Sequence, residues 1–260
     1  MKSTHRRMSW QEFLDLPRSV GWKHEYYGGK VHITPAHQSI PLELVLLRRA
    51  CPADERIQPV RDEDGPELVE PFVDGFRGTM DYCDLSVQTI RERALGFLAG
   101  FFSNKRGERL AASCLARSKS RGTIVGAALV RRGRQGPLLN AIFVRPRRRR
   151  TGIGTSLLSH VTAALIASGE TRLFSRIVLG NEPSLSWHRH AGFRERPDWL
   201  AAGHRARIYH DELERRRRLQ GPRGAGIAEL ERQANLWWRR YRRLDARFRR
   251  DPDSLQEWME

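Results

Sequence analysis

The chain has 260 residues, of which 39% are hydrophobic and 30% are charged, and its formal net charge is +17. This length and composition suit one large domain or one domain with appendages. No apolar run approaches the roughly 20 residues of a membrane span, and the N-terminus lacks the apolar core of a signal peptide, so we expect a cytoplasmic protein without membrane contact. Three scattered cysteines, Cys51, Cys83 and Cys114, argue against a disulfide framework or a structural zinc site.

The positive charge is concentrated in one part of the chain. Residues 101–250 hold 34 Lys and Arg against 11 Asp and Glu, whereas the first 100 residues hold 13 against 15. Such a surface attracts anions, including nucleic acid, acidic proteins and cofactor phosphates. However, the chain has 42 Arg and only 5 Lys, a skew that an arginine-favouring genome also produces. Nucleic acid is therefore a possible partner, but not the favoured one.

Residues 1–54 predict an N-terminal hairpin extension. Trp22–Tyr27 and Lys30–Thr34 read as strands that flank Gly28 and Gly29, a pair suited to a tight turn, and Pro35 ends the second run. The stretch resembles the opening of a restriction-nuclease-like family, but no D...E-x-K cluster follows it. We therefore expect a structural hairpin and no metal.

From residue 56 onward, strand and helix patterns alternate. Ile57–Val60 reads as a strand, and Asp62 or Asp64 can cap a helix that runs to Phe76 with a kink at Pro71. Ser86–Phe102 predicts a second helix, because its apolar residues recur at helical spacing. Arg109–Ala116 and Thr123–Val130 then predict a hairpin that pairs with the next strand.

That next strand, Leu138–Val144, leads through a basic glycine turn into a helix. Ile153, Leu157, Val161 and Leu165 recur at helical spacing. Glycines at the turn let backbone N–H groups approach a ligand, and the start of the helix leaves N–H groups unpaired with a partial positive charge behind them. A pyrophosphate would fit there.

The rest of the chain predicts a strand at Leu173–Leu179, a short helix at Ser184–Ala191 and closing strands at Phe193–Arg196 and Ala206–Tyr209. The tail, residues 213–260, predicts a basic helix that ends before Pro252. Its apolar residues alternate at spacings of three and four, as in a helix that packs on another surface: Ile227, Leu230, Ala234, Trp237, Tyr241, Leu244 and Phe248. That surface can be its own domain, a second copy in a homodimer, nucleic acid or a partner protein.

Two ordered motifs in this chain resemble those of the GCN5-related N-acetyltransferase (GNAT) superfamily. The acyl-CoA signature V-x-P-x-x-R/Q-x-x-G-x-G/A is similar to Val144, Pro146, Arg149, Gly152, Ile153 and Gly154. The second pattern, N-x-x-A-x-x-x-Y-x-x-x-G-F, is similar to Asn181, Ser184, His188, Gly192 and Phe193. The resemblance covers about residues 55–211. It implies an α/β fold: a mixed, mostly antiparallel sheet, splayed at its central strand and flanked by helices.

The resemblance also implies a reaction. Acetyl-CoA would donate an acetyl group to an unidentified amine, without a metal, in a domain at residues 55–212. The implied cofactor-binding residues are Ile142, Phe143, Val144, Arg149, Arg150, Thr151, Gly152, Ile153, Gly154, Thr155, Asn181 and Ser184.

Substrate and catalytic residues follow less directly from the resemblance. Asp81 and Tyr82 are candidate acceptor contacts. His188 stands where the family's tyrosine protonates the departing thiolate, so the resemblance makes His188 the candidate catalytic acid; the alternative is an ordinary helix residue, with water as the proton source. Asn140 and Ala141 stand where some relatives keep a glutamate base. The alternative is a noncatalytic module on the same fold that binds CoA or nucleic acid.

Overall fold

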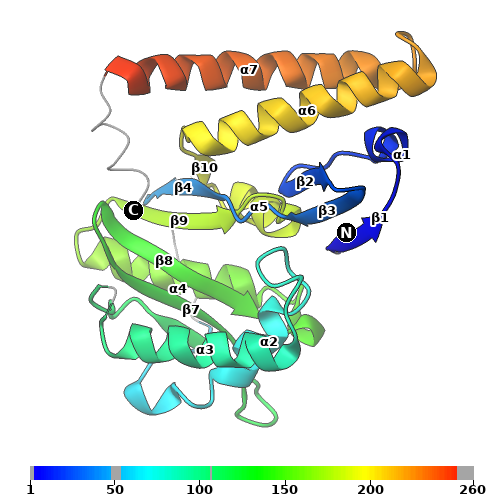
Figure 1. Ribbon diagram of the computed structural model, residues 1–260. Helices are drawn as coiled ribbons and strands as arrows, with labels where there is room; N and C mark the ends of the chain where they lie inside the picture. The colour runs from blue at the N-terminus through cyan, green and yellow to red at the C-terminus, as the bar shows by residue number, and fades with distance from the viewer. Residues whose placement is uncertain (1–2, 48–53, 106, 251–260) are drawn as a thin grey trace. The chain divides into compact units, whose positions relative to one another are not determined.

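The computed structural model describes residues 3–47, 54–105 and 107–250 (Figure 1). The chain divides into two compact units. The first, here called the sheet unit, comprises Leu42–Arg176 and Ser184–Arg194. The second, here called the helical unit, comprises Met1–Pro41, Ile177–Pro183 and Glu195–Glu260. The boundaries expected from the sequence, at residues 54 and 212, remain a prediction.

A seven-stranded mixed sheet runs in the order β10-β4-β9-β8-β7-β6-β5. Its strands are β4 (Ser39–Val45), β5 (Ile57–Pro59), β6 (Cys114–Arg117), β7 (Ile124–Gly133), β8 (Gly136–Val144), β9 (Arg172–Val178) and β10 (Arg194–Glu195). Strands β5 to β8 pair antiparallel, and β8 pairs parallel with β9. The predicted α/β class, with a mixed and mostly antiparallel sheet, is confirmed. Strand β6 begins at Cys114, so the strand predicted at Arg109–Ala116 was too long.

The sheet opens between β8 and β9. The two strands pair Leu138 with Phe174 and Leu139 with Ser175, near the beginning of β8. On the other side of β8, the register with β7 shifts so that Asn140 is an extra residue between the paired Leu139 and Ala141. Such a bulge bends its strand. The predicted splay at the central strand is therefore present.

Helices cover both faces of β7 and β8 (Figure 1). On one face lie α2 (Val69–Phe76) and α3 (Val87–Phe102), which share a core with Leu129, Ala141 and Phe143. On the other face lies α4 (Ile153–Ala167). Because successive side chains of a strand point to opposite faces, β7 and β8 supply apolar side chains to both layers.

Local signals explain the ends of these helices. Ser86 caps α3, since its side chain accepts a hydrogen bond from the Thr89 N–H at 3.0 Å. The helix expected from Asp62 to Phe76 is instead split into a 3-10 turn, η1 (Asp62–Asp64), and α2. Pro71 lies in the first turn of α2, where its missing N–H breaks no helical hydrogen bond.

The helical unit begins with a small sheet in the order β1-β3-β2. Its elements are β1 (Thr4–Arg7), α1 (Trp10–Asp15), β2 (Trp22–Tyr27) and β3 (Lys30–Pro35). Gly28 and Gly29 form the turn between β2 and β3 with φ angles of +57° and +70°, as predicted for this hairpin. Strand β1, which pairs with β3, was not predicted.

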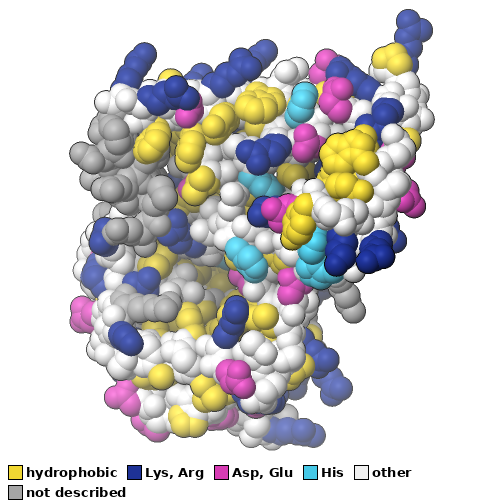
Figure 2. All heavy atoms as spheres, viewed as in Figure 1, with side chains coloured by type: hydrophobic (Ala, Val, Ile, Leu, Met, Phe, Trp, Pro, Cys, Tyr) yellow, Lys and Arg dark blue, Asp and Glu magenta, His cyan; other side chains and the backbone are white. Residues whose placement is uncertain are grey.

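Two long helices, α6 (Trp199–Gln220) and α7 (Ile227–Arg250), lie side by side in the helical unit (Figure 1). Trp199 stacks on Tyr241 and Phe248, with ring centroids 5.9 and 5.4 Å apart, and Arg205 lies over the Trp237 ring. The apolar stripe predicted for the tail helix therefore packs on α6. Arginines occupy the exposed side of α7, and Figure 2 shows Lys and Arg side chains projecting there.

The strand expected at Ala206–Tyr209 is wrong, because these residues lie inside α6. The run looks strand-like only in a short window. Over the whole segment, Ala202, Ala206 and Leu213 are buried positions at helical spacing, and the Asp198 side chain caps the helix by accepting from the Ala201 N–H at 2.7 Å.

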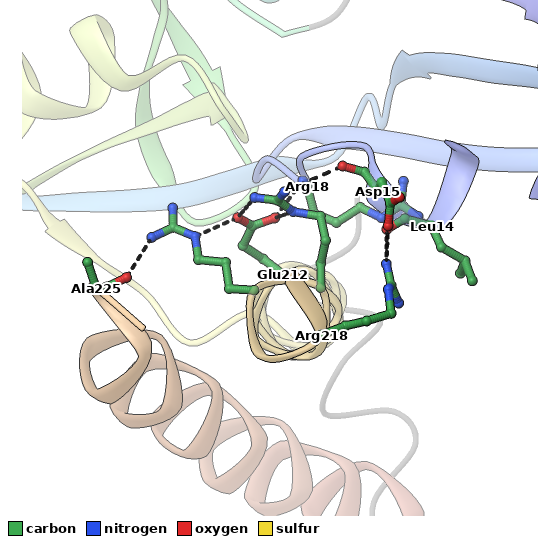
Figure 3. A network of polar contacts seen from close by, with 8 residues as sticks. Leu14, Asp15, Arg18, Glu212, Arg218 and Ala225 are labelled. Atoms are coloured by element: carbon green, nitrogen blue, oxygen red, sulfur yellow. Dashed lines mark hydrogen bonds and ion pairs between the residues drawn. The ribbon is translucent and has the colours of Figure 1, made fainter. Parts of the chain in front are cut away.

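An ion-pair network joins α6 to the segment that contains α1, and Figure 3 shows it from close by. The Glu212 carboxylate is 5% exposed and accepts hydrogen bonds from the Arg18 N–H and from the guanidinium groups of Arg215 and Arg216. Arg218 donates to Asp15 and to the Leu14 carbonyl. The network thus fixes the start of the chain to α6 within this unit.

The sequence predicts no membrane span, no metal site and no disulfide framework. Within residues 3–47, 54–105 and 107–250, no helix has the length and apolar character that a bilayer crossing requires. The same residues contain no group of three His, Cys, Asp or Glu side chains that could hold a metal ion. Neither Cys83 nor Cys114 forms a disulfide. Cys51 and Pro252 lie outside the described residues.

Candidate active site

The glycine turn after β8 forms an open helix N-terminus. A 3-10 turn, η2 (Pro146–Arg148), follows the strand, and Gly152 is the N-cap of α4 with a φ of +80°. No side chain caps this helix, and its first hydrogen bond runs from the Ser156 N–H to the Gly152 carbonyl at 2.9 Å. The N–H groups of the three residues before Ser156 therefore have no acceptor within the helix.

The arginine of the first motif stabilises this turn. The Arg149 guanidinium donates to the Gly75 carbonyl of α2 at 2.7 Å and to the Val144 carbonyl at 3.3 Å. The Thr151 hydroxyl donates to the Arg148 carbonyl at 2.7 Å, and Arg150 takes a left-handed φ of +60°. These side-chain contacts leave ligand binding mainly to the backbone N–H groups of the turn.

The open edge of β8 offers further backbone groups. The Arg145 N–H donates to the Val125 carbonyl of β7 at 2.8 Å, so the backbone groups of Phe143, two residues earlier, also face β7. The backbone groups of Ile142 and Val144 therefore face the opposite way, toward the gap that opens between β8 and β9. Arg149 uses the Val144 carbonyl, which leaves the N–H of Val144 and both groups of Ile142 for a ligand.

One residue beside the turn was not found from the sequence. A Cβ built on Gly154 would lie 3.6 Å from the indole Nε1 of Trp187, a residue of α5 (Glu182–His190). The Trp187 ring thus lies against the first turn of α4. Only its position next to His188 in the second motif could have drawn attention to it.

His188 lies in the interior of the sheet unit. Its side chain is 3% exposed, its Nδ1 is 2.8 Å from the Ser184 carbonyl, and its Nε2 is 3.3 Å from the Ser175 hydroxyl. Because a carbonyl only accepts, Nδ1 carries the proton and Nε2 accepts from Ser175 in the neutral ring. Burial lowers the pKa of His188, although its hydrogen bond to the Ser184 carbonyl opposes that effect. The ring is therefore neutral at neutral pH.

The other predicted contacts lie on loops and on α5. Ser184 supplies the carbonyl that holds His188, and Asn181 lies in the turn before α5, where its N–H donates to the Val178 carbonyl at 3.0 Å. Tyr82 lies in the loop between α2 and α3, with its ring 5.6 Å from Phe76 and 6.2 Å from Phe72. Burial and the nearby Asp81 raise the pKa of Tyr82.

Comparisons with known proteins assign part of the chain to a family. Residues 84–193 match the model of the acetyltransferase (GNAT) family. A GCN5-related N-acetyltransferase from Sphaerobacter thermophilus is 17% identical over 75% of this chain, with a TM-score of 0.46, and the match covers 57% of that protein's length. The PaiA N-acetyltransferase from Thermoplasma acidophilum, solved with coenzyme A, is 19% identical over 55% of this chain and 91% of its own, also with a TM-score of 0.46.

The matched residues contain the open turn, the free edge of β8 and the whole second motif. They begin in the loop before α3, continue through β6 to β9 and through α5, and end at Phe193. Residues 84–193 of the chain therefore belong to a domain of the GNAT acetyltransferase family.

Proposed function

We propose that this protein is a cytoplasmic N-acetyltransferase that moves an acetyl group from acetyl-CoA to an amine by direct attack. The observation that carries the proposal is the pairing of two features in one family domain. Strand β8 separates from β9 after Leu139, and the uncapped N-terminus of α4 follows at the end of the same strand. An extended ligand that ends in a pyrophosphate suits this arrangement.

The residues available at the site fit such a donor. The N–H groups at the start of α4, over Ile153, Gly154 and Thr155, would hold the pyrophosphate, with Gly152, Thr151 and Arg150 shaping the turn and Arg149 fixing it to α2. The backbone of Ile142 and Val144 would hold the pantetheine arm, while Phe143 supports β8 from the core. Asn181 and Ser184 would make the remaining amide contacts.

Acetyl-CoA would supply an acyl group activated as a thioester. The protein would hold the amine neutral and close to the carbonyl carbon, which is the main source of rate in a direct transfer. An N–H of β8 would stabilise the oxyanion. Asp81 and Tyr82, in the loop between α2 and α3, would contact the acceptor. Since both ring nitrogens of His188 are engaged, we assign it a positioning role for α5 and assign protonation of the thiolate to solvent.

A second candidate function is a noncatalytic CoA-binding module. It is favoured by the burial of His188 at the motif position where the family keeps its proton donor. Both candidates require CoA binding, and only the enzyme requires turnover. A homodimer through α7 remains a prediction. The apolar stripe of α7 is packed on α6, so a second copy would have to bind another face of α7.

The test is calorimetric titration of the protein with acetyl-CoA, followed by thiol release over a panel of amines. We expect binding, slow hydrolysis without an amine, and faster thiol release with the correct acceptor. Binding without release across primary-amine metabolites, peptides and proteins would favour the noncatalytic module. No binding at high micromolar acetyl-CoA would contradict both candidates.

A further inference from the structure

A cavity of about 640 Å³ lies at the end of β8 in the sheet unit. Four parts of the fold line it: the last part of α2, which contributes Asp74; the turn between β6 and β7; the start of β7; and η2 with the residue before it. We propose that this cavity binds the phosphate group of a small molecule other than the acyl donor.

The charge of the cavity wall supports an anionic ligand. Four arginines line it, Arg121, Arg145, Arg147 and Arg148, against one acid, Asp74. Arg145 Nη1 lies 3.5 Å from the Asp74 carboxylate. Within the described part of the chain, Arg121, Arg147 and Arg148 have no carboxylate within ion-pair distance. Three arginines that line the cavity are therefore not compensated by a carboxylate.

This lack of partners is unusual for the turn between β6 and β7. The two other cations in and next to this turn are paired: Arg117, at the end of β6, with Asp64 and Glu67, and Lys119 with Glu55 at 3.4 Å. In addition, the Nε of Arg145 is buried and has no hydrogen-bond partner. A buried donor without an acceptor costs about 1–3 kcal/mol, which a ligand oxygen would recover.

Hydroxyl groups complete the wall. Ser118, Ser120 and Thr123 line the cavity, and the Ser118 and Ser120 oxygens are 3.2 Å apart. Two backbone hydrogen bonds hold the turn, from the Ser118 N–H to the Thr123 carbonyl and from the Gly122 N–H to the Ser118 carbonyl, each at 2.9 Å. A wall that combines arginines with serine and threonine residues suits phosphate oxygens. The volume fits a small organic phosphate rather than a bare ion.

The cavity lies on the face of the sheet opposite α4. Phe143 faces α2, because a Cβ on Gly75 would lie 2.8 Å from the Phe143 Cβ. Arg145, two residues later, is on the same face and reaches Asp74 of α2. Val144 faces the other side, where it and Leu157 of α4 meet Gly126. That this cavity is separate from the acyl-donor site rests on the proposed function, which places the donor at the start of α4.

Inorganic pyrophosphate is the probe, titrated calorimetrically into the full-length protein at low salt with CoA at saturation. CoA occupies the turn at α4 under the proposed function, so remaining pyrophosphate binding that depends on Arg121 and Arg147 is assigned to the cavity. We expect one such site, and we expect Arg121→Gln and Arg147→Gln to weaken it about tenfold each. Arg194→Gln on β10 is the matched control, because Arg194 is exposed and its strand lies at the other edge of the sheet.

Two results would overturn the proposal: displacement of pyrophosphate by CoA, or equal affinity in wild type and both Gln variants. If the protein does not bind CoA at all, the proposed function fails separately. In that case the cavity is still judged by pyrophosphate affinity in Arg121→Gln against Arg194→Gln. Circular dichroism of each variant checks that these exposed substitutions leave the fold intact.

Discussion

At the scale of single residues, the environment of His188 argues against a role as general acid. A proton donor must reach its substrate, but this ring is buried and donates to the Ser184 carbonyl. In His188→Phe, we expect kcat to fall much less than the roughly hundredfold or more typical of a lost general acid. We also expect the variant to lose about 1–3 kcal/mol of stability, because the Ser175 hydroxyl and the Ser184 carbonyl lose a buried partner.

The measurement is kcat against pH for both proteins, together with urea unfolding. A positioning role leaves the shape of the pH profile unchanged. A hundredfold loss of kcat, with CoA affinity intact and the limb of the profile on the alkaline side removed, would establish His188 as the acid instead. Ser175→Ala is a useful companion, since it removes the partner of Nε2 but keeps the imidazole.

Gly152 is the second residue with a sharp prediction. Its φ of +80° is costly for any residue with a Cβ, although the space around it is open. In Gly152→Ala, we expect the turn to shift and acetyl-CoA affinity to fall about tenfold or more, with a stability loss of about 1 kcal/mol.

Gly169 provides the matched control at the other end of α4. It has a φ of +84° and equally open space, so Gly169→Ala carries the same backbone cost without touching the turn. Calorimetry should show weakened acetyl-CoA binding only in Gly152→Ala. Equal affinity in the two variants would mean that the start of α4 does not hold the cofactor.

At the scale of elements, the sequence correctly predicted helices and strands whose apolar pattern extends over the whole element. The stripe from Ser86 to Phe102 and the run from Leu138 to Val144 gave α3 and β8 within about two residues. The error at Ala206–Tyr209 came from a window of four residues, too short to separate a strand from one turn of α6.

The candidate site also combines features that the sequence could predict with features that it could not. The turn at Gly152 could be predicted because its chemistry is local to the sequence. The burial of His188, the place of Trp187 against Gly154 and the cavity at Arg121 depend on residues far apart in the chain. No spacing rule within one segment contains that information.

Within the helical unit, the contact between α6 and the start of the chain depends on Glu212. Burial alone would raise the pKa of its carboxyl, but hydrogen bonds from Arg215, the Arg18 N–H and Arg216 lower it to about 2. With its pKa lowered on folding, Glu212 stabilises the fold above its unfolded pKa of 4.5, and this is lost as the pH falls toward 2. We expect Glu212→Gln to cost about 2–3 kcal/mol at pH 7.

Urea unfolding at pH 7 and at pH 3 tests this expectation. The difference between wild type and Glu212→Gln should shrink at pH 3, because the wild-type carboxyl then loses part of its advantage. Glu214→Gln is the matched control: its carboxylate is 53% exposed and pairs with Arg217, so its loss should cost under about 1 kcal/mol. An equal, pH-independent cost for both variants would contradict the assigned role of Glu212.

At the scale of the whole molecule, the excess of arginine does not by itself indicate a partner. Many arginines of the described residues pair with carboxylates, as at Arg117, Arg132, Arg172 and Arg215. The positive charge of the surface is therefore partly compensated by these carboxylates even before salt screens it. Among the described residues, the cavity and the exposed side of α7 are two places where positive charge remains to act on other molecules.

The stability of the molecule in mild acid depends on two histidines of the helical unit. Burial, assisted by nearby arginines, lowers the pKa values of His24 and His204 to about 4, and His204 Nε2 accepts from the Gly21 N–H at 3.0 Å. Both rings are neutral when folded, whereas in the unfolded chain they gain a proton below pH 6.5. Their contribution to the free energy of unfolding is therefore complete above pH 6.5 and is lost as the pH falls from 6.5 to 4.

Allowing for solvent screening, we expect each histidine to cost about 1 kcal/mol between pH 7.5 and pH 5.5. Urea unfolding at these two pH values, followed by circular dichroism, measures the loss. In His24→Gln and in His204→Gln the loss should be smaller than in wild type, because one titrating group is gone. His190→Gln, at an exposed position of α5, should retain the wild-type loss. If the three variants lose the same stability as wild type, acid destabilisation arises elsewhere in the molecule and these two rings are protonated without cost.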